Sequence, residues 1–168
     1  MPAGYERGMP PEIIDRLAAL MHENYRHNAH TNRWPLKPEL DLPFAELAPD
    51  LQEANRAAAR RIGEVLAVGG IQILPAHQAH MQALSEVQLY DLVEQHMRQL
   101  APAEHEGWLQ QRLEAGWKYA AVRDDAQKLH PCIVPFAELS GADKEKDCNQ
   151  VRSYPALLRQ AGLVGVKG

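Results

Sequence analysis

The stretch that decides the fold is Pro-Phe-Ala-Glu-Leu at residues 43–47, because the same string recurs at residues 135–139, an offset of 92. Matches continue without a gap after each copy, at Glu53 and Glu145, Arg60 and Arg152, Leu66 and Leu158, and Gly70 and Gly162. Self-similarity at a fixed offset indicates an internal duplication. The units of a duplicated fold usually bury their apolar faces against each other, so the seam between them is a natural place for a site.

Upstream of the repeated string the two copies align with a different offset. His22-Glu23-Asn24-Tyr25 aligns with His105-Glu106-Gly107-Trp108 at an offset of 83, so the second copy carries nine extra residues (92 minus 83), which fall within 112–130. The expected organisation is one compact domain, 1–168, made of a first unit at residues 12–74, a joint at 75–83 and a second unit at 84–164.

Composition narrows the class of protein. The chain has 168 residues, of which 45% are hydrophobic, and this is typical of one packed domain. Its two cysteines, Cys132 and Cys148, are too few for a disulfide scaffold, no apolar run approaches ~18 residues, and the N-terminus lacks a signal sequence. We therefore expect a cytoplasmic protein with no membrane association.

Charge argues against nucleic-acid binding. The net charge is −4, whereas non-specific binding of DNA or RNA needs a concentrated Lys/Arg surface that displaces counterions. Arg56, Arg60 and Arg61 do cluster, but their spacing favours the solvated face of a helix.

The pattern of apolar residues predicts mainly helices with a few short β segments. One helix is expected from Pro11 into residues 22–25, with a loop near Asn28 and Asn32, and another at 49–67 that ends at Gly69-Gly70. A long amphipathic helix is expected at 85–100, and its apolar side is predicted to hold Leu84, Val87, Tyr90, Val93 and Met97.

Helix-capping and helix-breaking residues refine the prediction for the second unit. Ser140 and Asp143 resemble an N-terminal capping box. Pro155 stands where the first unit has Gly63, and a break or kink is predicted at both positions. Residues 132–136, bounded by prolines, can form only a brief extended or edge segment.

The second unit resembles a known family, the ryanodine receptor repeat or RyR domain. The residues that carry the resemblance are His105-Glu106-Gly107-Trp108, Arg112, Gly116-Trp117-Lys118-Tyr119, Arg123-Asp124-Asp125, Lys128, His130-Pro131, Val134-Pro135-Phe136 and Glu138-Leu139. The first unit resembles the family more weakly, through His22, Tyr25, Pro43-Phe44, Leu47, Asn55-Arg56 and Gly70. The resemblance implies a mainly helical fold in which two tandem repeats are related by a pseudo-twofold axis, as in calcium channels and in short stand-alone proteins of bacteria and their viruses.

The resemblance also implies a binding module and no enzyme. In one repeat pair of the channels, an aromatic residue after the His motif and a basic residue four positions later help form a cleft that accepts adenine nucleotides and flat aromatic drugs. The matching positions are Tyr25 in the first unit and Trp108 with Arg112 in the second. The first unit has Ala29 in place of the basic residue.

Residue spacing alone supports the same cleft. An aromatic face can stack a base for roughly 1–3 kcal/mol, and a guanidinium one helical turn away can bind a phosphate. Trp108 and Arg112 have this spacing, and Tyr25 facing Trp108 across a pseudo-twofold axis would form a slot. The alternative stays open that both rings belong to the core, as aromatic rings on amphipathic helices often do.

Four further residues are candidates for the same site. Trp117 and Tyr119 lie in the insertion of the second unit, either packed as a turn on the core or closing over the cleft. Trp34 and Arg33 are their candidate counterparts in the first unit, where they would supply a second ring and the cation missing at Ala29. Arg123 to Lys128 is expected to form a charged turn.

Metal binding and catalysis find weaker support. His22, His27 and His30 offer imidazoles, but their spacing does not align on a helix, and we expect no metal. His22 and His105 are equivalent, which favours a structural hydrogen bond from each ring to the loop of its own unit. Cys132 beside His130 lacks an orienting third group, so no catalytic residue is expected.

The sequence therefore predicts a module that senses or sequesters a nucleotide or nucleotide-derived signal in the cleft between two repeats, without a cofactor. The alternative is a protein interaction or oligomerisation module, with a second copy of the chain as one possible partner. Aromatic rings that face an open slot beside Arg112 favour the first function, and rings buried among side chains favour the second.

Overall fold

The computed structural model describes residues 8–168, and this part of the chain is mainly helical with short strands; the predicted lack of an N-terminal signal concerns residues outside this range. The elements, in order, are α1 (Pro11–Asn32), η1 (Phe44–Glu46), α2 (Pro49–Val68), β1 (Ile71–Pro75), α3 (Ala76–Ala79), η2 (His80–Gln82), α4 (Glu86–Gln95), α5 (Met97–Glu114), β2 (Lys118–Tyr119), β3 (Leu129–His130), η3 (Phe136–Glu138), α6 (Gly141–Arg152), α7 (Tyr154–Gln160) and β4 (Leu163–Lys167). No helix in residues 8–168 has the length and apolar character that crossing a membrane requires.

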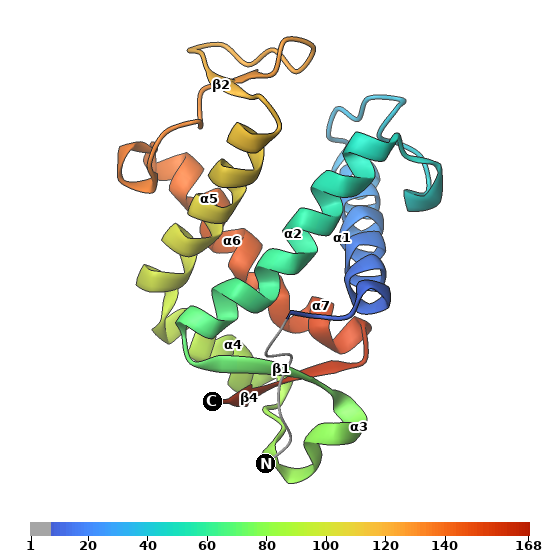
Figure 1. Ribbon diagram of the computed structural model, residues 1–168, viewed down its shortest axis with the longest axis vertical. Coiled ribbons are helices and arrows are strands. Elements are labelled where there is room, and N and C mark those ends of the chain that lie inside the picture. Colours follow the sequence, from blue (N-terminus) through green and yellow to red (C-terminus); the bar gives the residue numbers. More distant parts are fainter. Residues whose placement is uncertain (1–7) are drawn as a thin grey trace.

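The helices form two arms that share a base. Figure 1 shows α1 and α2 as one arm and α5 as the other, and the arms diverge toward the end of the molecule opposite β1 and β4. Helix α6 packs against α5, and α7 packs against β4 and α1 near the base. This arrangement sets helices of the first unit (residues 12–74) opposite helices of the second unit (residues 84–164).

Strands β1 and β4 join the ends of the two units in one antiparallel ladder. Ile71 pairs with Lys167, Ile73 with Gly165, and Pro75 with Leu163. Adding the sequence offset of 92 converts residue 71 to 163 and residue 75 to 167, so each outer pair converts to the other and the central pair joins two equivalent positions. The ladder therefore has the register that a local twofold axis through its centre requires.

Two equivalent histidines anchor the loops of their own units. Nε2 of His22 donates to the Leu42 carbonyl at 2.7 Å, and Nε2 of His105 donates to the Val134 carbonyl at 2.7 Å. Both rings are buried, and a buried imidazole needs such a partner. This confirms the structural role that the sequence predicted for the two rings.

Other matched details follow the repeated string. Pro43 and Pro135 adopt nearly the same backbone angles, φ −55° and ψ 149° against φ −57° and ψ 151°, and each precedes a single turn of 3-10 helix. An exposed ion pair also recurs at the offset of 92, between Arg60 and Glu53 at 2.8 Å and between Arg152 and Glu145 at 2.6 Å.

Several predicted helix limits are wrong. Helix α1 continues through Asn28 to Asn32 and ends where Arg33 adopts a left-handed conformation, so the loop expected near Asn28 does not form there. The helix expected at 85–100 is two helices, because the chain turns at His96 between α4 and α5. Its predicted apolar side is partly exposed, at Val87 and Tyr90.

The helix-capping and helix-breaking residues of the second unit act largely as predicted. Oγ of Ser140 accepts the Asp143 amide at the start of α6, and α6 ends before Pro155, which lies in the first turn of α7. Gly63 is different, because α2 runs through it without a break. Residues 132–136 form a turn and the start of η3, where an extended segment was expected.

One predicted surface residue is buried. Arg61 was assigned to a solvated face of α2, but only 7% of it is exposed, because α5 packs against this side of the helix. Its stem lies over Gly107 of α5, where a Cβ added to the glycine would overlap Cδ of Arg61 and lie 3.1 Å from Cγ. A glycine is needed at position 107 for the two helices to approach this closely.

We expect Gly107→Ala to lower the free energy of unfolding by about 1–3 kcal/mol through overpacking, although alanine gains about 1 kcal/mol in helix propensity. Gly63→Ala is the matched control, because the nearest atoms to a Cβ there are 3.8 Å away, and we expect it to be neutral or stabilising. Urea unfolding of both variants measures the difference. Equal effects at the two glycines would contradict the close approach of Arg61.

Candidate ligand-binding site

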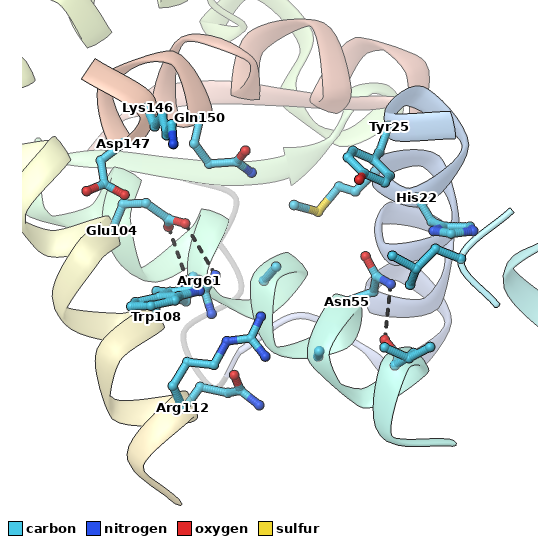
Figure 2. Close-up of a pocket in the computed structure, with 16 residues that line it drawn as sticks. His22, Tyr25, Asn55, Arg61, Glu104, Trp108, Arg112, Lys146, Asp147 and Gln150 are labelled. Carbon is cyan, nitrogen blue, oxygen red and sulfur yellow. Dashed lines mark hydrogen bonds and ion pairs between the residues drawn. The ribbon is translucent and has the colours of Figure 1, made fainter. Parts of the chain in front are cut away.

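A pocket of about 420 Å³ opens between the two units. Helices α1 and α2 form one wall, and α5 and α6 form the other (Figure 2). The lining residues are Met21, His22, Tyr25, Leu40, Leu51, Ala54, Asn55, Ala58, Arg61, Glu104, Trp108, Gln111, Arg112, Lys146, Asp147 and Gln150. A cavity of this volume is within the range that small ligands occupy.

Trp108 forms part of the α5 wall and is half-buried. Its ring stacks on His105 with centroids 5.5 Å apart and meets His130 edge-on at 5.2 Å. These contacts fix the orientation of the indole. The residue therefore belongs both to the packing of the second unit and to the pocket wall.

Arg112 lies one helical turn after Trp108, and its guanidinium points into the pocket (Figure 2). Its Cζ lies 5.6 Å from the centre of the Trp108 ring and 4.9 Å from that of Trp117, so two indoles hold the cation. Nε is buried and has no hydrogen-bond partner within residues 8–168. A buried donor without a partner costs about 1–3 kcal/mol, more where it is charged, so Arg112 is suited to bind an acceptor.

Nearby positive charges, in addition to burial, disfavour the charged form of Arg112. Burial lowers the pKa of Arg112 below its ordinary value, and the nearby Arg123 and Arg61 lower it further by repulsion. An arginine still keeps its proton at physiological pH. Repulsion of this kind would be relieved by an anion bound beside Arg112.

Tyr25 and Asn55 face these groups from the first unit, and Figure 2 shows Tyr25 across the pocket from Trp108. Tyr25 is 42% exposed, so its ring is accessible to a ligand. Ala29, which aligns with Arg112 in the sequence, is buried and does not line the pocket. The pocket lining thus includes an aromatic residue from each unit, Tyr25 and Trp108. A basic residue four positions after the aromatic one is present only in the second unit, as Arg112.

The deep end of the pocket holds a buried polar cluster. Glu104 accepts from Nε and Nη2 of Arg61, both at 3.3 Å, and from the hydroxyl of Tyr154 at 2.6 Å. Burial, followed by the charge of Glu104, raises the pKa of Tyr154 well above its ordinary value, so the hydroxyl remains a donor. This cluster joins α2, α5 and α7 and compensates the charge of Arg61.

A second pair of ionisable side chains lies on the α5 and α6 wall. Nδ1 of His105 lies 3.3 Å from the carboxylate of Asp147. Burial lowers the pKa of His105, but the interactions with Asp147 and with the Val134 carbonyl outweigh it, so the pKa is raised above 6.5. The first unit has Asn55 at the position equivalent to Asp147, and thus no such charge beside His22.

This asymmetry predicts a pH dependence. Because the folded pKa of His105 is raised, the stability it contributes is fully present below about pH 6.5 and is lost as the pH rises through the folded pKa. We expect Asp147→Asn to remove this contribution, so the difference in unfolding free energy between wild type and variant shrinks from pH 5 to pH 8. The control is Glu53→Gln, which alters an exposed ion pair without touching histidine. A difference that stays constant with pH would contradict the role of Asp147.

The part of the chain that forms the α5 and α6 wall also matches a known family. Residues 82–164 match the family described as the RyR domain. The chain contains an RyR domain. It spans the end of η2 to β4 and supplies Trp108, Arg112 and Asp147 to the pocket, whereas Tyr25 and Asn55 come from the preceding part of the chain.

Four predicted site residues lie outside the pocket lining. Trp117, in the RyR domain, meets His130 at a centroid distance of 6.2 Å. Its ring packs against the guanidinium of Arg112 but does not line the pocket. Tyr119 is 58% exposed on β2. Trp34 is 51% exposed, Arg33 caps α1, and neither is among the residues that line the pocket.

The histidines considered as metal ligands are spread along α1. His22 bonds the Leu42 carbonyl, His30 contacts Asp41 at 2.9 Å, and His27 is exposed. Within residues 8–168 no three His, Cys, Asp or Glu side chains are grouped to hold a metal ion. In the RyR domain, burial raises the pKa of the Cys132 thiol, which disfavours the reactive thiolate.

Sequence reasoning missed several polar residues of the pocket. Glu104 and Gln111 share a helical face with Trp108 and Arg112, so the 3.6-residue period could have found them. Asp147 could have been found as the equivalent of Asn55. Arg61 gave no such signal, because only the packing of α2 on the RyR domain makes it part of the wall.

Proposed function

We propose that residues 12–74 form a second, divergent repeat of the RyR type, related to the RyR domain by a pseudo-twofold axis. The register of β1 and β4 supports this, because the central pair joins residues 73 and 165. The equivalent loop anchors of His22 and His105 support it as well. The pocket then lies at the seam between two repeats.

We further propose that this pocket binds a small flat anion, a nucleotide or a nucleotide-derived signal. The observation that carries the proposal is the buried, unpartnered Nε of Arg112 at the pocket wall. A phosphate oxygen is the acceptor that a guanidinium binds best, often through two parallel hydrogen bonds.

The balance of charge in the pocket favours an anion. Glu104 forms an ion pair with Arg61, and the other acidic residue of the lining, Asp147, is accompanied by Lys146 on the same helix. Arg112 forms no ion pair with any carboxylate of residues 8–168. The uncompensated charge that a ligand meets in the wall is therefore positive.

The remaining wall suits a flat heterocycle. Tyr25 offers an exposed ring, and Trp108 offers the part of its ring that its own packing leaves open. Asn55, Gln111 and Gln150 add side-chain amides, which donate and accept in the patterns that base edges present. Together these groups could stack a base and bind its edge while Arg112 binds its phosphate.

The proposed role is binding without catalysis. Sensing a signal and sequestering it use the same pocket, and both follow from tight, reversible binding. Among the described residues, those that line the pocket include no cysteine or serine, and their one histidine, His22, is committed to the Leu42 carbonyl.

Thermal unfolding against a panel of adenine and guanine nucleotides and cyclic oligonucleotides tests the function. A ligand at 100 times its dissociation constant adds about 2.7 kcal/mol to the stability, which raises the midpoint by roughly 5–10 °C for a domain of this size. We expect such a shift with at least one nucleotide. No shift across the panel would contradict the proposal and favour the protein interaction module.

A further inference from the structure

The two units also meet at the open end of the pocket, through a pair of loops. The first loop, residues 33–43, connects α1 to η1, and the second loop, residues 120–128, connects β2 to β3. Figure 1 shows both loops at the end opposite β1 and β4. Nζ of Lys37 in the first loop lies 3.2 Å from Oδ2 of Asp125 in the second, so an ion pair bridges the two arms.

A second cation holds the same carboxylate. Nε of Arg123 donates to Oδ1 of Asp125 at 2.7 Å, and Nη2 donates to Oδ2 at 3.3 Å. The pKa of Asp125 is lowered, first by Arg123 and also by Lys37, which keeps the carboxylate ionised. Asp125 therefore occupies a position in which a guanidinium fork and an ammonium converge on one anion.

This bridge lies at the rim of the pocket. On one side, the carbonyl of Lys37 accepts the amide of Leu40 at 2.9 Å, and Leu40 lines the pocket. On the other side, the second loop follows β2, and the residue before β2, Trp117, donates its amide to the Arg112 carbonyl at 2.9 Å and packs its ring on the Arg112 guanidinium. The cations of the bridge thus continue the positive wall that begins at Arg112.

Two cations, Lys37 and Arg123, form ion pairs with the carboxylate of Asp125. The carboxylate of the neighbouring Asp124 accepts a hydrogen bond from the backbone amide of Gln127 at 3.1 Å. Lys37 and Arg123 are mostly exposed, and an exposed ion pair contributes little stability, so a stronger anion can displace the carboxylate.

We propose that the rim is a subsite for a second phosphate, and that Asp125 occupies it in the free protein until the ligand replaces it. A phosphate carries more charge and more acceptor oxygens than a carboxylate, so Arg123 and Lys37 bind it more strongly. The pocket then selects ligands with at least two phosphates, such as nucleoside diphosphates, over nucleoside monophosphates. The nucleotide part of this inference rests on the proposed function.

Calorimetric titration with AMP, ADP and inorganic pyrophosphate tests the subsite. We expect wild-type protein to bind ADP at least tenfold more tightly than AMP. Arg123→Gln and Lys37→Gln should each reduce that preference to less than threefold while leaving the affinity for AMP within about twofold. Asp125→Asn, which removes the competing carboxylate, should tighten the binding of ADP.

The matched control is Arg98→Gln, an exposed arginine near the opposite end of α5, which should leave the preference for ADP unchanged. Equal affinities for AMP and ADP in wild type would overturn the subsite, as would a preference for ADP that survives both rim substitutions. Pyrophosphate separates the two proposals. Binding of pyrophosphate that depends on Arg123, with no binding of either nucleotide, would overturn the nucleotide function and keep the rim site, whereas no binding of any of the three would overturn both.

Discussion

Glu104→Ala will lower the free energy of unfolding by about 3–5 kcal/mol, the usual cost of removing one partner from a buried ion pair. Glu104 is 4% exposed and accepts hydrogen bonds from Arg61 and Tyr154. Without it, the guanidinium of Arg61 stays buried between α2 and α5 with no compensating charge, and the Tyr154 hydroxyl loses its acceptor. Urea unfolding monitored by circular dichroism measures the loss.

Two further variants separate burial from charge as the cause. Glu53→Ala removes the carboxylate of an exposed pair with Arg60, and we expect it to cost less than about 1 kcal/mol. The double variant Arg61→Met with Glu104→Ala removes both buried charges, so its loss should be smaller than the loss from Glu104→Ala alone. A Glu104→Ala variant as stable as Glu53→Ala would show that the cluster does not join the two units.

Arg112→Met will reduce the affinity for a nucleotide that binds the pocket by about 10–100-fold, because a hydrogen bond to a charged group is worth about 1.5–3 kcal/mol. The ligand-free variant should be as stable as wild type or more so. Methionine keeps an apolar chain between Trp108 and Trp117 and removes the buried donor that has no partner within residues 8–168.

The opposed effects on binding and stability distinguish a ligand-binding residue from a structural one. Arg112→Lys is the informative second variant, because lysine keeps the charge but has no guanidinium fork, and we expect it to recover only part of the affinity. Arg98→Met, at an exposed position of the same helix, should change neither quantity. A loss of stability in Arg112→Met without a loss of affinity would contradict the proposed role.

Local signals in the sequence predicted local structure well. The proline and acidic residue at the start of α1, and the Ser140 cap of α6, act within a single turn, so their effects do not depend on the rest of the fold. The loop anchors of His22 and His105 were also predictable, because equivalent positions in two similar units favour one shared role.

Features that depend on packing between distant helices were not predictable. Arg61 lies in a charged, helical stretch that is typical of a solvated surface, and only the approach of α5 at Gly107 buries it. The turn at His96 has no proline or glycine to mark it. The exposure of Val87 and Tyr90 was missed because α4 buries the face that holds Leu89 and Val93.

The candidate site shows the same division. Tyr25, Trp108 and Arg112 were predicted from residue type, spacing and resemblance, and all line the pocket. Trp34 and Arg33 were predicted only from their proximity in sequence; α1 extends to Asn32 just before them, and neither residue lines the pocket. Sequence distance is a poor guide to position once a helix continues for two further turns.

The most direct test of the proposed pocket is nuclear magnetic resonance of the Arg112 Nε–H group during titration with ADP. We expect this resonance to move downfield as ADP saturates the protein, because a phosphate oxygen then accepts its hydrogen bond. An Arg112 resonance that stays unchanged while ADP saturates another set of signals would place the ligand elsewhere and contradict the assignment of this pocket as the binding site.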